Sequence, residues 1–345
     1  MKHGSTGALA LGVAIEKFPL KQPFHITGHT MTDANVVTVE LKQGGDVGRG
    51  EASGVYYRQS DDVAGMVKQI EAVRARIEAG IDRESLQHLL PRGGARNAVD
   101  CALWDLDAKR TGSSVWQMAG LDTPRPLLTT MTVGANTPDK MAADALAYAG
   151  AKAIKLKLTG QPIDADRVRA VRAARRDVWL GVDANQGFTR PFLETLLPVL
   201  IEARVELIEQ PFKVGDEVQL DGLKSPIPLA ADESVQGLAD VSPLVGRVDI
   251  INIKLDKCGG LTEGLAMARE ARRLGLGVMV GNMVGTSLAM APSFLVGQLC
   301  NVVDLDGPVF LSRDRSPSVQ YEQGMISCPE QIWGAPGSAG HNERR

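Results

Sequence analysis

The sequence predicts an α/β fold in which a barrel of alternating strands and helices follows a smaller α+β domain. The chain has 345 residues, which suits a barrel of about 250 residues and one further domain. From Thr130 onward short apolar runs alternate with helical stretches, whereas the preceding residues show no regular alternation. Polar residues also gather at the ends of the apolar runs, which is where barrel enzymes carry their chemistry.

The region before the barrel is expected to mix strands and helices. Two strand-like runs, residues 9–18 and 35–42, flank a polar stretch. A helix is predicted over residues 61–79, because its apolar side chains recur at three- and four-residue steps and form one stripe. A second helix is predicted over residues 97–110 and is stopped by Gly112.

Eight short apolar runs are the candidate barrel strands, and their regular spacing favours a closed sheet. A doubly wound open sheet is the alternative fold. Against it, no dinucleotide-binding fingerprint follows the first strand, and Gly48, Gly50 and Gly54 have the wrong spacing for one. The predicted strands are residues 131–135, 153–158, 178–183, 205–209, 228–232, 250–255, 277–281 and 302–306.

Composition excludes several classes of protein. The 44% apolar and 23% charged residues are those of an ordinary globular protein rather than a disordered one. The 38 Lys and Arg residues include no dense basic run and are matched by 41 acids, so nucleic acid is a poor candidate partner. No apolar stretch approaches the roughly 20 residues that cross a bilayer, so no membrane partner is expected.

The cysteines and the first residues bear on localisation. Cys101, Cys258, Cys300 and Cys328 are far apart and form neither a zinc nor a redox spacing, which suits thiols in a reducing compartment. The apolar run at residues 8–15 has no cleavage pattern after it, and we interpret it as a strand rather than a signal peptide. A cytoplasmic location is therefore predicted.

The second predicted barrel strand contains two lysines, Lys155 and Lys157, whose side chains point the same way because strand residues alternate. An isolated K-x-K motif more often lies on a solvated edge. Here Ile154, Leu156 and Leu158 would pack outward against helices, which leaves the lysines facing the barrel lumen. Two adjacent cations in a partly dry site are expected to lower each other's pKa, which makes a lysine a usable base.

Three acids end consecutive predicted strands: Asp183, Glu209 and Asp232. Any one of them alone is more often a helix cap or a loop acid. At matched positions on neighbouring barrel strands, however, three carboxylates form one arc of hard oxygen ligands. With no His or Cys among them they suit Mg²⁺ far better than zinc. The sequence therefore predicts a magnesium site.

Lys254 is an isolated charge inside the sixth predicted strand, which stands opposite the second in a barrel of eight. The carboxylate arc then lies between two facing lysines, Lys157 and Lys254. This geometry can remove a proton from one face of a carbon and return one to the other face, which is a 1,1-proton transfer. The metal would stabilise the enediolate of the substrate carboxylate, and Lys155 would add a second cation.

The eighth predicted strand ends in two aspartates, Asp304 and Asp306, on one side of the strand. The alternative interpretation is a turn before Gly307 and Pro308. Because the eighth strand faces the fourth, the pair is expected to lie opposite the metal. It would bind a cationic group of a substrate whose carboxylate is at the metal.

These residues resemble the muconate-lactonizing subgroup of the enolase superfamily, and within it the dipeptide epimerases. The likeness runs from about Phe18 to Asp306, and it is dense at RNAVDCALWDL (residues 96–106), at the K-x-K motif and at IKLDKCGGLTE (residues 253–263). It implies a (β/α)7β catalytic barrel at residues 126–311. It also implies a capping domain of the enolase N-terminal type at residues 1–125, completed by about residues 312–345.

The resemblance also implies how the substrate is bound. The aspartate pair resembles the dipeptide-epimerase hallmark that binds the substrate α-ammonium, and Thr132 is a further candidate contact. Capping-domain loops near residues 25–32 and 53–60 are expected to close over the barrel mouth. Alanyl-glutamate epimerases carry an arginine in the first loop, where this chain has Gly28. Arg58 and His29 are the alternatives for a charge that would meet the glutamate side chain.

The leading hypothesis is a Mg²⁺-dependent dipeptide epimerase that inverts the α-carbon of the C-terminal residue, with L-Ala-D/L-Glu as the expected substrate. A muconate cycloisomerase, an o-succinylbenzoate synthase or an N-acylamino acid racemase is the alternative within enzymes, and Asp304 and Asp306 argue against it because those substrates lack a free ammonium. A third hypothesis is a barrel that binds a ligand without catalysis. It is disfavoured because both lysines and all three carboxylates of the predicted site are present. No histidine lies in the barrel, so a His-Asp base of the mandelate racemase type is not expected. Assembly of the chain into a homo-oligomer is compatible with the sequence.

Overall fold

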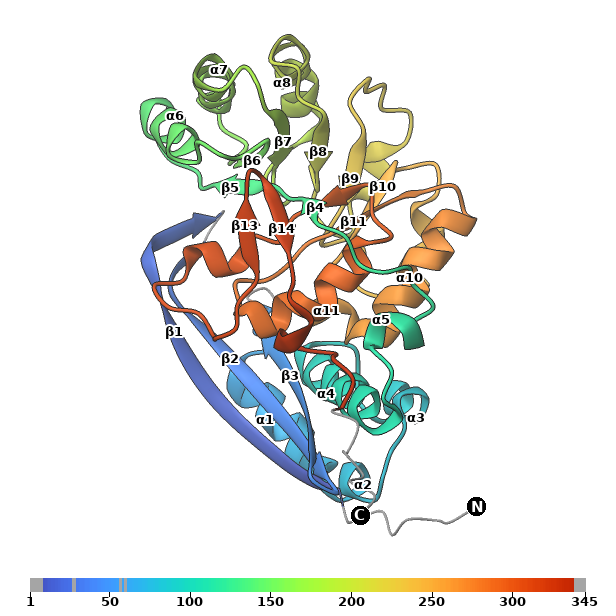
Figure 1. The fold of residues 1–345 in the computed structure, drawn as a ribbon. Helices are drawn as coiled ribbons and strands as arrows, with labels where there is room; N and C mark the ends of the chain where they lie inside the picture. Colours follow the sequence, from blue (N-terminus) through green and yellow to red (C-terminus); the bar gives the residue numbers. More distant parts are fainter. Residues whose placement is uncertain (1–8, 27–28, 56–57, 59–60, 338–345) are drawn as a thin grey trace.

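The computed structural model describes residues 9–26, 29–55, 58 and 61–337. Figure 1 shows the antiparallel sheet of the N-terminal unit, with its helices, at one end of the molecule and a curled parallel sheet surrounded by helices at the other. The expected combination of a barrel and an α+β unit is therefore confirmed. Within these residues no helix is both long and apolar enough to span a bilayer.

The N-terminal unit begins with an antiparallel sheet of β1 (Ala10–Ile26), β2 (His29–Gln43) and β3 (Asp46–Ser53). The third strand was not predicted, because its glycines interrupt the apolar pattern. Those glycines have a packing role: a Cβ atom on Gly50 would overlap the carbonyl oxygen of Ala98 in helix α4 (Gly94–Thr111). The sheet and the helix therefore approach at backbone distance.

The helices of this unit cover one face of the sheet (Figure 1). The predicted helix 61–79 is two helices, because the chain leaves helical geometry at Val73, with φ −115° and ψ 7°. Gly112 ends α4 as predicted, in the left-handed region at φ 68°. The helices are α1 (Val63–Ala72), α2 (Arg74–Glu78), α3 (Arg83–Leu89), α4 (Gly94–Thr111) and α5 (Val115–Met118).

The parallel sheet contains the eight predicted strands in sequence order. Its two end strands are joined at the seam by single bonds rather than a ladder: the Thr130 N–H donates to the Val303 carbonyl at 3.0 Å, and the Leu305 N–H donates to Thr129 Oγ1 at 3.0 Å. The strands are β5 (Met131–Val133), β6 (Ala153–Lys157), β7 (Trp179–Asp183), β8 (Leu207–Glu209), β9 (Leu229–Ala231), β10 (Ile250–Ile253), β11 (Gly277–Val280) and β12 (Val302–Val303).

Helices surround the sheet on its outer face (Figure 1). Short 3₁₀ helices, η1 (Glu217–Leu220), η2 (Leu238–Asp240) and η3 (Ser242–Leu244), stand after β8 and β9 in place of longer helices. The predicted strand 250–255 ends at Ile253, and a one-turn helix, α9 (Leu255–Cys258), follows at once. The longer helices are α6 (Pro138–Ala147), α7 (Asp164–Ala174), α8 (Arg190–Glu202), α10 (Leu261–Arg273) and α11 (Ser287–Gly297).

The lumen of the sheet is apolar at one end and charged at the other. Leu207, Ala230 and Met279 form a buried cluster with Trp179 in the lower lumen. Gly181 makes room for that indole, since a Cβ atom there would lie 2.7 Å from it. The outward-facing Ile154, Leu156 and Leu158 are buried in the main core, as predicted. The upper lumen is left to the charged residues.

The end of the chain touches both parts of the molecule. A hairpin of β13 (Gln320–Glu322) and β14 (Met325–Ser327) pairs with β4 (Leu127–Leu128). Before it, η4 (Gly307–Phe310) leads to Arg315, which bonds Glu16 and Glu51 of the N-terminal sheet. After it, η5 (Glu330–Ile332) precedes Trp333, whose indole N–H donates to the Arg49 carbonyl.

Candidate active site

A cavity of about 590 Å³ lies where the N-terminal unit meets the C-terminal ends of the barrel strands. The barrel contributes charged and amide side chains to its wall, among them Lys157, Asn185, Asp232, Glu233 and Lys254. The N-terminal unit contributes Phe24, Met31, residues 53–55 and Arg58. Predicted catalytic lysines and residues of the predicted capping-domain loops therefore line the same cavity.

The three predicted acids, Asp183, Glu209 and Asp232, come together at the barrel mouth. All three are buried, and one carboxylate oxygen from each lies within 4.8 Å of the others. Burial, and then the negative charge of Asp183, raise the pKa of Glu209 above its ordinary value. Three buried carboxylates that repel one another fit a divalent cation with hard oxygen ligands, such as Mg²⁺.

Three further buried oxygens near this cluster have no hydrogen-bond partner within the described part of the chain: Asn185 Oδ1, Glu233 Oε2 and Asn252 Oδ1. Burial, and then the charge of Asp232, raise the pKa of Glu233 to about 8. The surroundings of the carboxylates are therefore rich in acceptors, which also suits a cation.

Asp183 and Glu209 have both carboxylate oxygens engaged. One oxygen of Asp183 accepts from Lys157 Nζ at 2.5 Å, and the other accepts from the Asn185 N–H at 2.8 Å. One oxygen of Glu209 accepts from Lys155 Nζ at 2.9 Å, and the other accepts from Asn252 Nδ2 at 2.6 Å. Each acid thus accepts one hydrogen bond from a lysine and one from an amide, and Lys155 Nζ also lies 3.8 Å from Asp183 Oδ2.

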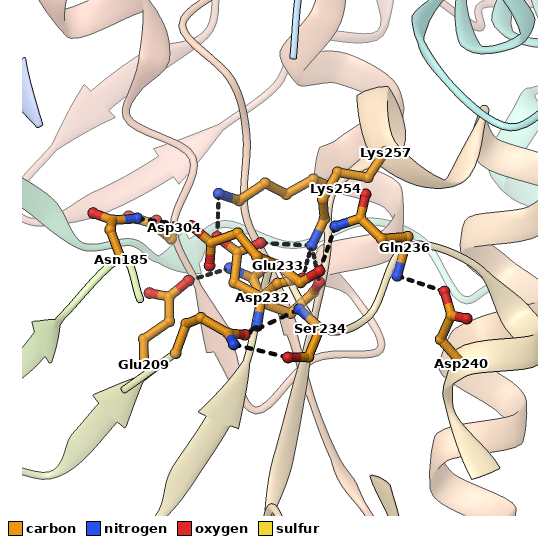
Figure 2. A network of polar contacts seen from close by, with 12 residues as sticks. Asn185, Glu209, Asp232, Glu233, Ser234, Gln236, Asp240, Lys254, Lys257 and Asp304 are labelled. Carbon is orange, nitrogen blue, oxygen red and sulfur yellow. Dashed lines mark hydrogen bonds and ion pairs between the residues drawn. The ribbon is translucent and has the colours of Figure 1, made fainter. Parts of the chain in front are cut away.

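Asp232 has a lysine on each oxygen (Figure 2): Lys254 Nζ lies 2.7 Å from Oδ2 and Lys257 Nζ lies 2.5 Å from Oδ1. Burial alone would raise the pKa of Asp232, but these two ammonium groups hold it well below its ordinary value. Lys157 and Lys254 thus stand at opposite ends of the carboxylate cluster, as predicted. Lys257, Asn252 and Asn185 were given no role in the prediction.

Lys155 corrects the expectation that the two strand lysines lower each other's pKa. Its ammonium group is buried and bonds Asp304 as well as Glu209. Burial by itself would lower the pKa of Lys155, but Asp304, Glu209 and Asp183 raise it well above its ordinary value. For Lys155, carboxylates outweigh the neighbouring cations, so this lysine keeps its charge.

Asp304 and Asp306 follow β12 at the seam of the sheet. Thr130 Oγ1 and Lys155 donate to Asp304, and the Thr132 N–H donates to Asp306 Oδ2 at 2.7 Å. Burial, and then the charge of Asp304, raise the pKa of Asp306 to about 6. Neither aspartate is among the described residues that line the large cavity. Both are nearly buried, with 4% of each residue exposed.

Thr132 lines a second cavity of about 410 Å³ beside β5. Phe24 lines both cavities, and its ring lies 4.6 Å from that of Phe310 in the second. The structure therefore brings Thr132 and Asp306 together, and the ring of Phe24 lies between the cavity that Thr132 lines and the cavity that Lys157 and Lys254 line.

Arg58 lies in the wall of the large cavity, as expected for a substrate contact. Its guanidinium donates to Asp61 at 3.0 Å, to the Lys257 carbonyl at 3.3 Å and to Gln236. Gly28 lies outside the described residues, as does the side chain of His29. Among the described residues of the N-terminal unit, Arg58 is thus the cationic side chain in the cavity wall.

A parallel barrel whose mouth holds a buried carboxylate cluster between two lysines defines a class: enzymes that use a divalent cation to move a proton beside a substrate carboxylate. The chain matches the family model "Enolase C-terminal domain-like" over residues 139–337. It matches the "Mandelate racemase / muconate lactonizing enzyme, N-terminal domain" over residues 10–120. The chain belongs to this family within the enolase superfamily.

Two curated relatives act on glutamate derivatives. An L-Ala-D/L-Glu epimerase of Escherichia coli (strain K12) is 40% identical over 313 residues, covering 90% of this chain and 97% of the relative. An N-acetyl-D-glutamate racemase of Pseudoalteromonas sp is 37% identical over 293 residues, covering 84% and 91%. The relatives are therefore isomerases that invert a carbon in amino acid derivatives.

Two solved structures share this fold, and each holds a metal cation and a dipeptide. An enolase family member from Agrobacterium tumefaciens with homology to dipeptide epimerases, with bound sodium and L-Ala-L-Glu, is 41% identical, with a TM-score of 0.91, covering 94% of this chain and 100% of that one. A dipeptide epimerase from Methylococcus capsulatus, complexed with Mg and L-Arg-D-Lys, is 29% identical, with a TM-score of 0.87, covering 93% and 97%.

Proposed function

We propose that this chain is a Mg²⁺-dependent dipeptide epimerase, with L-Ala-D/L-Glu as the first substrate to test. The observation that carries the proposal is the pair of lysines at the two ends of one carboxylate cluster: Lys157 on Asp183 and Lys254 on Asp232. The relatives and solved structures support the substrate class. The reaction would invert the α-carbon of the C-terminal residue.

In this proposal Asp183, Glu209 and Asp232 hold the Mg²⁺. When bound, the ion supplies positive charge that stabilises the negative charge developing on the substrate carboxylate. Lys157 and Lys254 act as the two bases, one on each face of the α-carbon. One lysine removes the α-proton, and the other returns a proton to the opposite face. Lys155, which keeps its charge, adds a fixed cation beside Glu209.

The aspartates at the seam would bind the substrate ammonium, with Thr132 beside them. A single amino acid would hold its ammonium too close to its carboxylate to reach both the metal and the seam, whereas one more residue adds about 3.5 Å of extended chain. In the structure Asp304 bonds Lys155 and Asp306 accepts from the Thr132 N–H. An ammonium group would share these carboxylates, and Phe24 would have to leave room for the peptide.

A racemase of N-acylated glutamate is the second candidate. The 37% identical N-acetyl-D-glutamate racemase favours it, and so do the existing partners of Asp304 and Asp306, because an N-acyl substrate brings no ammonium to them. Both candidates need the same lysines and the same metal site. They differ in what they require at the seam.

The domain limits and the location belong to the same proposal. We place the capping domain at residues 1–125 with the chain end from about 312, and the barrel at residues 126–311. The bonds from Arg315 and Trp333 to the N-terminal sheet support that division. Arg58 is the proposed partner of an acidic substrate side chain, and a cytoplasmic location is proposed from the thiol content.

Exchange of the α-proton in D₂O tests the function. The panel contains L-Ala-L-Glu, L-Ala-D-Glu, other alanyl and hydrophobic dipeptides, and N-acetylglutamate. Deuterium at the C-terminal α-carbon of a free dipeptide is the expected result. Preference for N-acetylglutamate over every free dipeptide would favour the second candidate, and no exchange with any compound would overturn both.

A further inference from the structure

The parallel ladder between β9 and β10 stops one residue short of the candidate metal site. Its register partners are Ile250 with Ala230 and Ile251 with Ala231. The next residues on the two strands are Asn252 and Asp232, and they are not partners. Asp232 therefore lies just beyond the end of this ladder, so no backbone pairing with β10 fixes the position of this candidate metal ligand.

The ammonium group of Lys257 fills this gap. Its Nζ donates to the Asp232 carbonyl at 2.5 Å, to the Asn252 carbonyl at 3.1 Å and to Asp232 Oδ1 at 2.5 Å. These three acceptors match the three N–H bonds of a lysine. The side chain thus joins the two strand ends where the backbone ladder has ended, and it also fixes one oxygen of the carboxylate.

The turn after β10 delivers Lys257 to this place. The strand ends at Ile253, Lys254 is the N-cap of α9, and the Lys257 N–H donates to the Lys254 carbonyl at 3.0 Å. Gly259 ends the helix in the left-handed region at φ 94°. Lys257 is 1% exposed and does not line the large cavity. Lys257 therefore contacts Asp232 on the side away from the cavity, whereas Lys254 lines the cavity.

Fixed contacts hold the backbone and one carboxylate oxygen of Asp232, including a bond from the Val235 N–H to its carbonyl at 3.2 Å, and one contact is free to change. Gln210 Oε1 accepts from the Asp232 N–H at 2.8 Å, and Lys257 binds the carbonyl and Oδ1. The remaining oxygen, Oδ2, is bound by Lys254, which as a base must exchange that contact for the substrate (Figure 2). Lys257 therefore keeps the carboxylate oriented when Lys254 moves.

We propose that Lys257 is a positioning residue that sets the spacing between the metal ligand Asp232 and the base Lys254. The inference deepens the proposed function and rests on it for the roles of those two residues. Substituting a group that orients a metal ligand commonly costs about 10- to 100-fold in activity or affinity. Here the loss should fall mainly on the isomer that Lys254 serves, because Lys157 is held by the other half of the sheet.

The test compares α-proton exchange of L-Ala-L-Glu and L-Ala-D-Glu in D₂O. Lys157→Ala and Lys254→Ala first assign each isomer to one lysine. In Lys257→Met, exchange of the isomer assigned to Lys254 is expected to fall about 10- to 100-fold, with a smaller loss for the other isomer. An unchanged ratio between the isomers would overturn the proposal.

The matched control is Arg175→Met. Arg175 is another buried cation that holds backbone carbonyls, those of Ala145, Tyr148 and Ala151, before the start of β7. Its loss should lower the melting temperature while leaving the isomer ratio at the wild-type value. A ratio shifted equally in both variants would mean that Lys257 serves general stability only.

A second measurement needs neither metal nor substrate. Amide hydrogen exchange of the apoprotein should become faster at residues 229–236 and 250–258 in Lys257→Met but not in Arg175→Met. If Lys257→Met does not fold, Lys257→Gln carries both tests, because its amide can still donate two bonds. If the wild type exchanges no dipeptide, the proposed function is wrong, and amide exchange alone decides whether Lys257 joins the strands. Unchanged protection would contradict that bridge.

Discussion

The two proposed bases belong to halves of the barrel mouth that are built in different ways. Lys157 is the register partner of Asp183 across β6 and β7, and Asp183 is the register partner of Glu209 across β7 and β8. On the other side the β9–β10 ladder ends before Asp232, and the side chain of Lys257 joins the strands instead. One half is spaced by backbone, and the other by a buried side chain.

The difference has a physical consequence for mutation. A backbone ladder keeps its spacing whatever side chains it carries, whereas a side-chain bridge is lost with one substitution. The seam between β12 and β5 depends in part on a side chain as well, because Asp306 accepts from the Thr132 N–H beside the backbone bond from Thr130 to Val303. Sensitivity to conservative substitution should therefore be concentrated on the Lys254 half and at the seam.

Metal removal is expected to have the largest effect and to abolish the difference between the halves. The ion serves both directions of the reaction, so chelation with excess EDTA should stop α-proton exchange of both isomers, and Mg²⁺ should restore it. The measurement is deuterium incorporation for each isomer before and after addition of Mg²⁺. Full turnover by a metal-free preparation would contradict the assignment of the three carboxylates.

Removal of either base should separate the halves most sharply. Lys157→Ala and Lys254→Ala are each expected to lower epimerisation by at least about 10²- to 10⁴-fold, the usual contribution of a positioned acid or base. Each variant should still exchange the α-proton of the isomer presented to its surviving lysine. Normal epimerisation by either variant would exclude the two-base arrangement.

Substitutions at the seam are expected to follow. Loss of the partner of a buried charge commonly costs about 2 to 5 kcal/mol, so Asp304→Asn and Asp306→Asn should lower kcat/KM for a free dipeptide accordingly. Asp306→Ala should also weaken the seam, because Asn can still accept from Thr132 and Ala cannot. Kinetics and melting temperature together separate the charge from the bond. Undiminished kcat/KM in both Asn variants would point to the N-acyl substrate class.

A pH profile should give the smallest effect. The pKa of Asp306 is raised to about 6, first by burial and then by Asp304. Below this pH the carboxyl is neutral and attracts an ammonium weakly; above it the carboxylate is charged. Hence kcat/KM for a dipeptide should rise as the pH increases through about 6, the free-enzyme pKa. Asp306→Asn should lack this step, and N-acetylation of the substrate should remove it in the wild type.

Strand alternation was sufficient to predict most of the charged cluster. Lys155, Lys157, Asp183 and Glu209 lie on strands whose bounds were nearly right, so the rule that alternate residues face the lumen applied to them directly. The same rule would have found Asn252, which stands two residues before Lys254 and donates to Glu209. Asn252 was overlooked because an amide inside an apolar strand carries no charge to attract attention.

The alternation rule could not identify Lys257, because this residue lies outside the strand. The predicted strand continued to residue 255, but the strand ends at Ile253, and α9 then turns the chain back on itself. Beyond the true end, alternation no longer gives the direction of a side chain. The pKa of Lys155 was mispredicted for a related reason. The K-x-K motif reveals the neighbouring lysine, which would lower the pKa of Lys155. The carboxylate of Asp304, which raises that pKa, lies 149 positions away in sequence and is not evident from the motif.

In the N-terminal unit, β3 was missed because its glycines break the apolar alternation, although Gly50 lies directly against α4. The terminal hairpin was missed because its strands, QYE and MIS, are mostly exposed or half-buried and form no apolar run like those of the equally short barrel strands. Both elements are defined by what they pack against, and a local pattern does not contain that information.

The contacts of Arg315 also set an order of events during synthesis. This residue pairs with Glu16, 299 positions earlier, and with the buried Glu51. Domains generally fold from the N-terminus as the chain emerges from the ribosome. Here a nascent chain shorter than 315 residues has its first sheet but not the cation that neutralises it. The N-terminal sheet therefore completes its packing only after the whole barrel has been translated, so the part made first is finished last.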